Sequence, residues 1–243
     1  MSLTDRRPTA PLPEEHERLA ELLAVTSPTH RAHAGQLQTV PVLDALRPLL
    51  PAGALVPGQV VQSTDPGLRL ALVAGMHAAD EHGADWLAIL NGVDVGLAAL
   101  AGLGAELDRI LLVDRAGAAT AEVISALAPA VPLILVEGDD APDPVLARRL
   151  TALLRRHHCT LVTAAPWPGQ HLRLDVVDPV WHGIGDGHGQ ITGRDITVLV
   201  SGRGSAGAGS AHRLALPTED GRVVHLGRAQ ARTGLRDDLA RSL

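Results

Sequence analysis

The stretch Leu50–Ala74 constrains the fold more than any other part of the chain. An apolar strand over Gln59–Gln62 is followed by a short loop, Ser63–Gly67, and by a helix that starts near Leu68. This strand–loop–helix order is the one in which a phosphate-binding loop opens an α/β ATPase core. The stretch therefore predicts the scaffold of such a core.

The loop itself lacks the groups that bind nucleotide. A phosphate-binding loop surrounds the phosphates with backbone N–H groups, contacts the outer phosphates with a lysine and holds Mg²⁺ with a hydroxyl. Here Pro66 removes one N–H donor, Asp65 places a negative charge where phosphate would lie, and Leu68 stands where a lysine is wanted. We therefore predict no cofactor and a degenerate phosphate loop, made of Ser63, Thr64, Asp65, Pro66, Gly67, Leu68 and Arg69.

Composition excludes several classes of protein. All 21 basic residues other than histidine are arginine, so an intact phosphate-loop lysine, a Schiff-base lysine and a Ser–Lys dyad are ruled out. Phenylalanine and tyrosine are absent, and the only tryptophans are Trp86, Trp167 and Trp181. The sequence therefore argues against modules that read single strands with rows of aromatic side chains.

The net charge, the single cysteine and the short apolar runs lead us to expect a cytoplasmic protein that does not bind nucleic acid strongly. A net charge of −6 argues against a strongly nucleic-acid-binding domain. The single cysteine, Cys159, rules out an intrachain disulfide and fits a reducing compartment. Charged residues interrupt every apolar run before it reaches transmembrane length, and no apolar signal core follows the basic pair near the N-terminus.

Strand and helix patterns alternate along the middle of the chain. Apolar strands are expected at Trp86–Leu90, Ile110–Val113, Leu133–Val136 and Cys159–Ala164. Helices are expected at Val40–Leu50, Leu68–His82, from an Asp94 cap to Leu103 (with Gly104 as its stop), at Ala118–Leu127 and at Asp143–His157. Such continuous apolar strands require a parallel sheet that is covered on both faces.

The pattern then changes to strands joined by glycine-rich turns, at His171–Val177, Ile196–Ser201, His212–Leu216 and Val223–Leu226. The predicted fold class is therefore α/β, a RecA-like core whose largely parallel sheet is flanked by helices and extended by C-terminal antiparallel strands. We divide the chain into residues 1–38, with a disordered start, a helix at Pro13–Val25 and a linker, the core 39–227, and a C-terminal tail or helix 228–243.

Candidate catalytic and metal-binding residues each have a simpler interpretation. Asp114 and Glu137 end apolar strands, where an ATPase would bind Mg²⁺ or polarise water, but we expect helix caps or solvated charges. The groups His157–His158–Cys159 and His182, Asp186 and His188 lack metal-ligand spacing. Cys159 is expected to be a buried, inert thiol, and the glycine-rich Ser201–Ser210 a hairpin connection.

Four arginines form a basic face on the predicted Asp143–His157 helix, opposite its leucines: Arg148, Arg149, Arg155 and Arg156. This face suits DNA or an acidic partner. The alternative is a solvated face opposite a core face.

Several segments together resemble a known family. The turn and strand LPAGALVPGQVVQ resemble the entry to the RecA-type core, and HHCTLVTAA resembles the strand that leads to its DNA-contacting loop. More specifically, the segments VPVLDALRPLLPAGALVPGQVV, GLAALAGLGAELDRILLVD and WPGQHLRLDVVDPVWHGIGDGHGQITGRDITVLVSGRG resemble actinobacterial ImuA-prime proteins, RecA-related accessory factors of the mutagenic repair assembly. The similarity runs from about Val40 to Leu226.

This resemblance implies a role in DNA-damage-induced translesion synthesis (the SOS response), in the cytoplasm and at the nucleoid when DNA is damaged. It implies binding to ImuB, a Y-family polymerase homologue, and through ImuB an indirect link to a DnaE-type error-prone polymerase and the sliding clamp. RecA is a further candidate partner. The chain departs from RecA in its phosphate loop and in the short segment Pro166–Gln170, where RecA has its second DNA loop. Direct DNA contact is therefore expected to be weak or absent.

Three functions follow as hypotheses. The first is a non-enzymatic adaptor that binds its partner through the tail, where Leu235, Leu239 and Leu243 form an apolar stripe with Arg236 nearby, although the stripe also suits a helix packed on its own domain or a frayed tail. The second is an atypical ATPase that uses Arg69 in place of lysine, which a guanidinium does poorly. The third is a RecA regulator that contacts DNA through the basic helix face.

Overall fold

The computed structural model describes residues 39–77, 85–185, 188–203 and 209–229. All of them lie in the second of two units into which the chain divides, Leu37–Leu243. The helix expected at Pro13–Val25 and the tail stripe from Leu235 to Leu243 lie outside the described residues.

The described strands form one nine-stranded sheet in the order β3-β2-β4-β5-β1-β6-β7-β8-β9. Its parallel part contains β1 (Val60–Gln62), β2 (Leu87–Leu90), β3 (Ile110–Val113), β4 (Leu133–Val136) and β5 (Thr160–Thr163). Strand β6 (Leu172–Gly185) joins β1 in parallel, and β7 (His188–Gly202), β8 (Ser210–Ala215) and β9 (Val224–Arg228) extend the sheet antiparallel. The predicted α/β class is confirmed.

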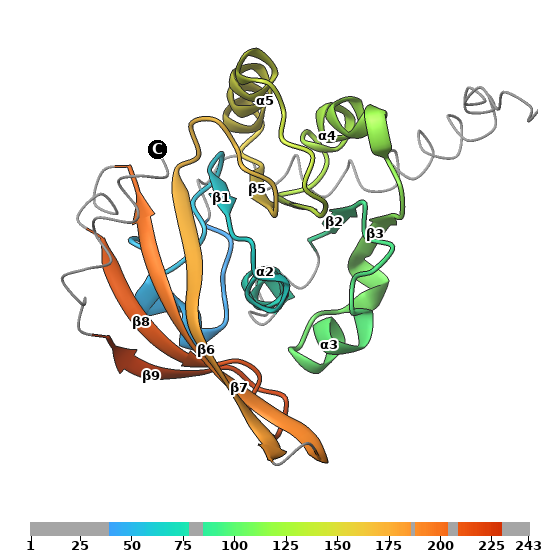
Figure 1. Cartoon of the computed structure of the whole chain (residues 1–243). Coiled ribbons are helices and arrows are strands. Elements are labelled where there is room, and N and C mark those ends of the chain that lie inside the picture. Colours follow the sequence, from blue (N-terminus) through green and yellow to red (C-terminus); the bar gives the residue numbers. More distant parts are fainter. Residues whose placement is uncertain (1–38, 78–84, 186–187, 204–208, 230–243) are drawn as a thin grey trace, which may run out of the picture. The chain divides into compact units, whose positions relative to one another are not determined.

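Helices cover both faces of the parallel strands (Figure 1). Helices α2 (Pro66–Ala74) and α3 (Leu97–Gly102) lie on one side, and α4 (Thr120–Leu127) and α5 (Pro144–Arg156) on the other. The chain runs outward from β1 to β3 through α2 and α3 and returns through α4 and α5, so right-handed crossovers place the two pairs on opposite faces. Strands β2, β4 and β5 are buried along their whole length, as their apolar sequences require.

Local sequence explains where the helices begin. Asp65 and Asp143 each precede a proline and accept hydrogen bonds from the first-turn amides of α2 and α5, so both are N-caps. The Asp94 cap was a wrong prediction, because α3 begins only at Leu97, after Gly96, without a side-chain cap. Gly104 follows α3 with φ = 97°, as expected of a helix stop.

Two predicted helices are shorter than expected. The helix expected over Val40–Leu50 is the 3₁₀ helix η1 (Asp44–Leu49), which contains Pro48, has Leu46 and Leu49 buried, and contacts β8 and β9. Helix α2 ends at Ala74 and passes into the 3₁₀ turn η2 (Gly75–His77). A Cβ atom at Gly75 would lie 2.2 Å from the backbone nitrogen of Leu43, so the chain approaches this helix end closely. Two further 3₁₀ turns, η4 (Leu107–Arg109) and η5 (Gly117–Ala119), precede β3 and α4.

The largest difference from the sequence prediction lies in β6 and β7. We expected strands of about seven and six residues, whereas both run on into a two-stranded ribbon that projects beyond the rest of the sheet (Figure 1). The glycines of this segment suggested turns. Instead the strands continue through irregular pairing between Val177 and Val180 and between His182 and Ile184.

A buried histidine in β8 makes the stability of this region depend on pH. Burial lowers the pKa of His212 below its ordinary value of 6.5, and the neighbouring His225 and Arg228 lower it further. Since the unfolded chain then binds the proton more readily, the free energy of unfolding falls as pH drops below about 6.5. Urea unfolding between about pH 7.5 and pH 5.5 should show this loss. His212→Gln should reduce the loss, and an unchanged pH dependence in that variant would contradict this assignment.

Candidate functional site

The degenerate phosphate loop lies at the carboxyl ends of the parallel strands. Strand β1 leads into Ser63, which is buried and whose N–H donates to the carbonyl of Thr163 at the end of β5. The chain then turns through Asp65 into the first turn of α2. This edge is where open α/β sheets bind ligands, so the groups that fill it decide what the site can do.

An aspartate fills the N-terminus of α2. Asp65 Oδ1 accepts a hydrogen bond of 2.8 Å from the N–H of Leu68. Both carboxylate oxygens of Asp65 also accept from Arg194 of β7, at 2.7 and 2.9 Å, and the two side chains are only 10% and 11% exposed. The positive end of the helix dipole and one arginine are thus already matched by a carboxylate of the chain itself.

A second ion pair uses Arg69, the last residue of the degenerate phosphate loop. Arg69 donates from Nε to Glu137 Oε1 at 2.9 Å, from Nη2 to Glu137 Oε2, and from Nη1 to the carbonyl of Ser63 at 2.8 Å. The side chains of Arg69 and Glu137 are 5% and 15% exposed. The interpretation of Glu137 as a cap or solvated charge is therefore wrong, because it is the partner of Arg69. Asp114, by contrast, is exposed.

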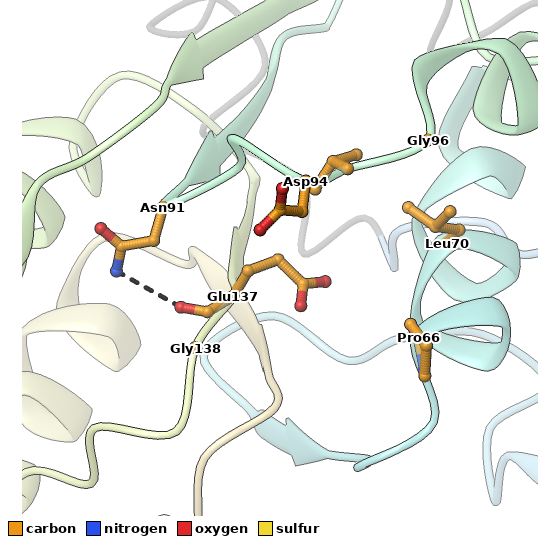
Figure 2. A pocket seen from close by; sticks show the side chains of 8 residues that line it. Pro66, Leu70, Asn91, Asp94, Gly96, Glu137 and Gly138 are labelled. Atoms are coloured by element: carbon orange, nitrogen blue, oxygen red, sulfur yellow. Dashed lines mark hydrogen bonds between the residues drawn. The ribbon is translucent and has the colours of Figure 1, made fainter.

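A cavity of about 390 Å³ lies beside these ion pairs. Figure 2 shows it between the start of α2, the loop that follows β2 and the loop that follows β4. Among the residues that line it, Asp94 and Glu137 are acidic and none is basic. Asn91 fixes one wall, because its Nδ2 donates to the carbonyl of Glu137 at 3.3 Å and its Oδ1 accepts from the N–H of Ala116 at 2.8 Å. An anionic phosphate chain has no complementary charge here.

Comparison with known proteins identifies the family. Residues 48–169 match the model of the MT3502 N-terminal domain. The chain is also 32% identical to the Mycobacterium tuberculosis protein Rv3395c over a 168-residue alignment that covers 64% of this chain and 79% of that protein. The chain belongs to the MT3502 family. The matched MT3502 region contains both loop carboxylates and Arg69, whereas Arg194 lies beyond its end.

The basic face of this MT3502-family chain is present as predicted. Arg148, Arg149, Arg155 and Arg156 are exposed on α5, while Leu150 and Leu154 of the same helix are buried. One of the four is engaged, since Arg155 Nη2 lies 2.6 Å from Nε2 of His171. Burial lowers the pKa of His171, as do the charges of Arg155 and Arg203.

The structure also shows the surroundings of the other residues that the sequence singles out. Cys159 is buried as predicted, and burial raises the pKa of its thiol far above the ordinary value. In the ribbon, His182 Nε2 lies 3.3 Å from Asp195 Oδ1. Asp186 lies outside the described residues. Across the described ranges, no group of three or more histidine, cysteine or acidic side chains lies close enough to hold a metal. In the same part of the chain, no helix is both long and apolar enough to cross a bilayer.

Sequence reasoning missed Arg194 entirely. It lies 129 residues from Asp65, within a segment whose glycines predict a turn. The one signal in the sequence is Asp65 itself, because a carboxylate in a buried loop requires a cation. The sequence does not say which arginine supplies that cation.

Proposed function

We propose that this chain is a non-catalytic accessory protein of DNA-damage-induced mutagenesis, an adaptor of the ImuA-prime type. It acts in translesion synthesis by binding an ImuB-like polymerase homologue, which in turn contacts a DnaE-type polymerase and the sliding clamp. RecA is a further candidate partner. The resemblance from Val40 to Leu226 supports this partner set, and membership of the MT3502 family is compatible with it.

One observation carries the non-catalytic part of the proposal. Arg69 of the degenerate phosphate loop is bound to Glu137, and Asp65 of the same loop is bound to Arg194. A nucleotide would have to break these pairs before Arg69 or Arg194 reached its phosphates, and a broken buried pair costs several kcal/mol. The ATPase fold therefore serves as a scaffold that presents surfaces to other proteins.

Co-expression with an ImuB-like homologue tests the proposal. The two chains should elute together in size-exclusion chromatography, and they should separate when residues 230–243, with Leu235, Arg236, Leu239 and Leu243, are deleted. This deletion leaves β9 intact, since β9 ends at Arg228. A wild-type chain that elutes apart from the homologue at micromolar concentration would contradict the proposal.

A second function, regulation of RecA with direct DNA contact, is favoured by the exposed arginines of α5. Arg148, Arg149 and Arg156 have no carboxylate partner among the ion pairs of the described residues. A DNA mobility shift that weakens steeply with salt and is lost in Arg148→Gln/Arg149→Gln would support this function. The absence of any shift at low salt would dismiss it.

A further inference from the structure

The ribbon consists of residues 180–185 of β6 and residues 188–195 of β7, and it exposes apolar side chains. Among the described residues ten large apolar side chains are exposed, and four of them lie in this ribbon. They are Val180, Trp181, Ile184 and Ile191, each exposed by between 51% and 55%. Scattered exposed apolar residues are ordinary, whereas a concentration of them in one projecting element indicates an interaction surface.

Apolar groups lie on both faces of this ribbon. Val180 pairs with Asp195 and the next residue, Trp181, pairs with Arg194. Because successive residues of a strand point to opposite faces, Val180 and Trp181 lie on opposite sides. A flat partner surface would cover only one of them, so the shape that buries both is a groove.

The same segment is nearly free of charge. Residues 179–193 contain no arginine or glutamate and a single aspartate, Asp186, in a chain whose charged content is 20%. Nucleic acid binding requires cations that neutralise phosphates, and this segment has no arginine or lysine, only His182 and His188. Protein interfaces, by contrast, are depleted of charge at their centre and enriched in tryptophan. The complementary surface is therefore an apolar, uncharged groove on a protein.

The degenerate phosphate loop holds the base of the ribbon in place. The Arg194 guanidinium binds both oxygens of Asp65, donates from Nε to the carbonyl of Leu216 at 3.0 Å, and lies 5.1 Å from the centre of the Trp181 ring. An isolated two-stranded hairpin is only marginally stable in water. These contacts preorganise the ribbon and reduce the conformational entropy lost on binding.

We propose that this ribbon is a docking element that inserts into an apolar groove of a protein partner, with Trp181 as its main anchor and the Asp65–Arg194 pair as its brace. The proposal rests on the proposed function, since it takes the partner to be the ImuB-like homologue.

The test measures binding of the full chain to that homologue by calorimetry. The double variant Trp181→Ser/Ile184→Ser should raise Kd by roughly 10- to 100-fold. The matched control is Leu107→Ser/Val145→Ser, at two side chains that are 45% and 67% exposed elsewhere in the fold, and it should leave Kd within about twofold. Circular dichroism should show both variants folded, because all four side chains are already about half exposed or more.

Hydrogen exchange on the wild-type complex provides the second measurement, with the amides of residues 180–185 and 188–193 becoming protected. If the wild-type complex forms and the ribbon variant binds equally well without such protection, the docking element is refuted and the adaptor function stands. If no complex forms, both fail. Self-association or binding to a single-stranded oligonucleotide that the ribbon variant abolishes would also overturn the proposal, in favour of a second copy or of DNA.

Discussion

Replacing Arg69 with alanine is expected to lower the free energy of unfolding by about 3–5 kcal/mol. The substitution leaves the Glu137 carboxylate, which is 15% exposed, without the guanidinium that neutralises it. It also removes the donor to the Ser63 carbonyl. Domains of this size are stabilised by only about 5–15 kcal/mol, so the variant should unfold at a much lower urea concentration.

Two further variants separate the charge effect from general damage. Arg69→Met/Glu137→Leu removes both charges, and it should recover most of the lost stability because an apolar pair of similar volume replaces a buried ion pair at little cost. Arg47→Ala breaks the exposed pair with Asp44, whose side chains are 65% and 95% exposed, and should cost no more than about 1 kcal/mol. A cost for Arg69→Ala as small as that of Arg47→Ala would refute the buried pair.

The parallel half of the fold was predictable because its signals are local. The apolar runs Ile110–Val113 and Leu133–Val136 are strands with the predicted bounds, since a charged residue or a proline flanks each run on both sides. Helix α5 follows from Asp143 and Pro144 at its start and from leucines at helical spacing. In these elements propensity, capping and burial all favour the same structure.

The rest depends on contacts between distant residues. The glycines of the ribbon predict turns, and only the pairing of β6 with β7 shows that these residues are strands. Glu137 lies 68 residues from Arg69, and Arg194 lies 129 residues from Asp65. The sequence showed that the phosphate loop lacked its lysine, but no local rule assigns the replacement charges to their partners.

The second large expected effect is a very low affinity of the chain for nucleotide. The loop offers phosphate few free donors, because Pro66 has no N–H, the N–H of Leu68 is bound to Asp65 and that of Asp65 lies 3.4 Å from the Ser63 hydroxyl. Asp65 also repels a triphosphate at the helix N-terminus, where phosphate-loop proteins provide backbone amides and a lysine. We therefore expect Mg-ATP to bind with a Kd above about 1 mM, which corresponds to less than roughly 4 kcal/mol of binding free energy.

Calorimetric titration of the full chain with Mg-ATP measures whether the degenerate phosphate loop still binds nucleotide. We expect no saturable heat with Mg-ATP at concentrations up to about 1 mM. Binding at micromolar Kd, abolished by a substitution at Arg69 that leaves the chain folded, would show that the loop still binds triphosphate and that its ATP-binding function has not been lost.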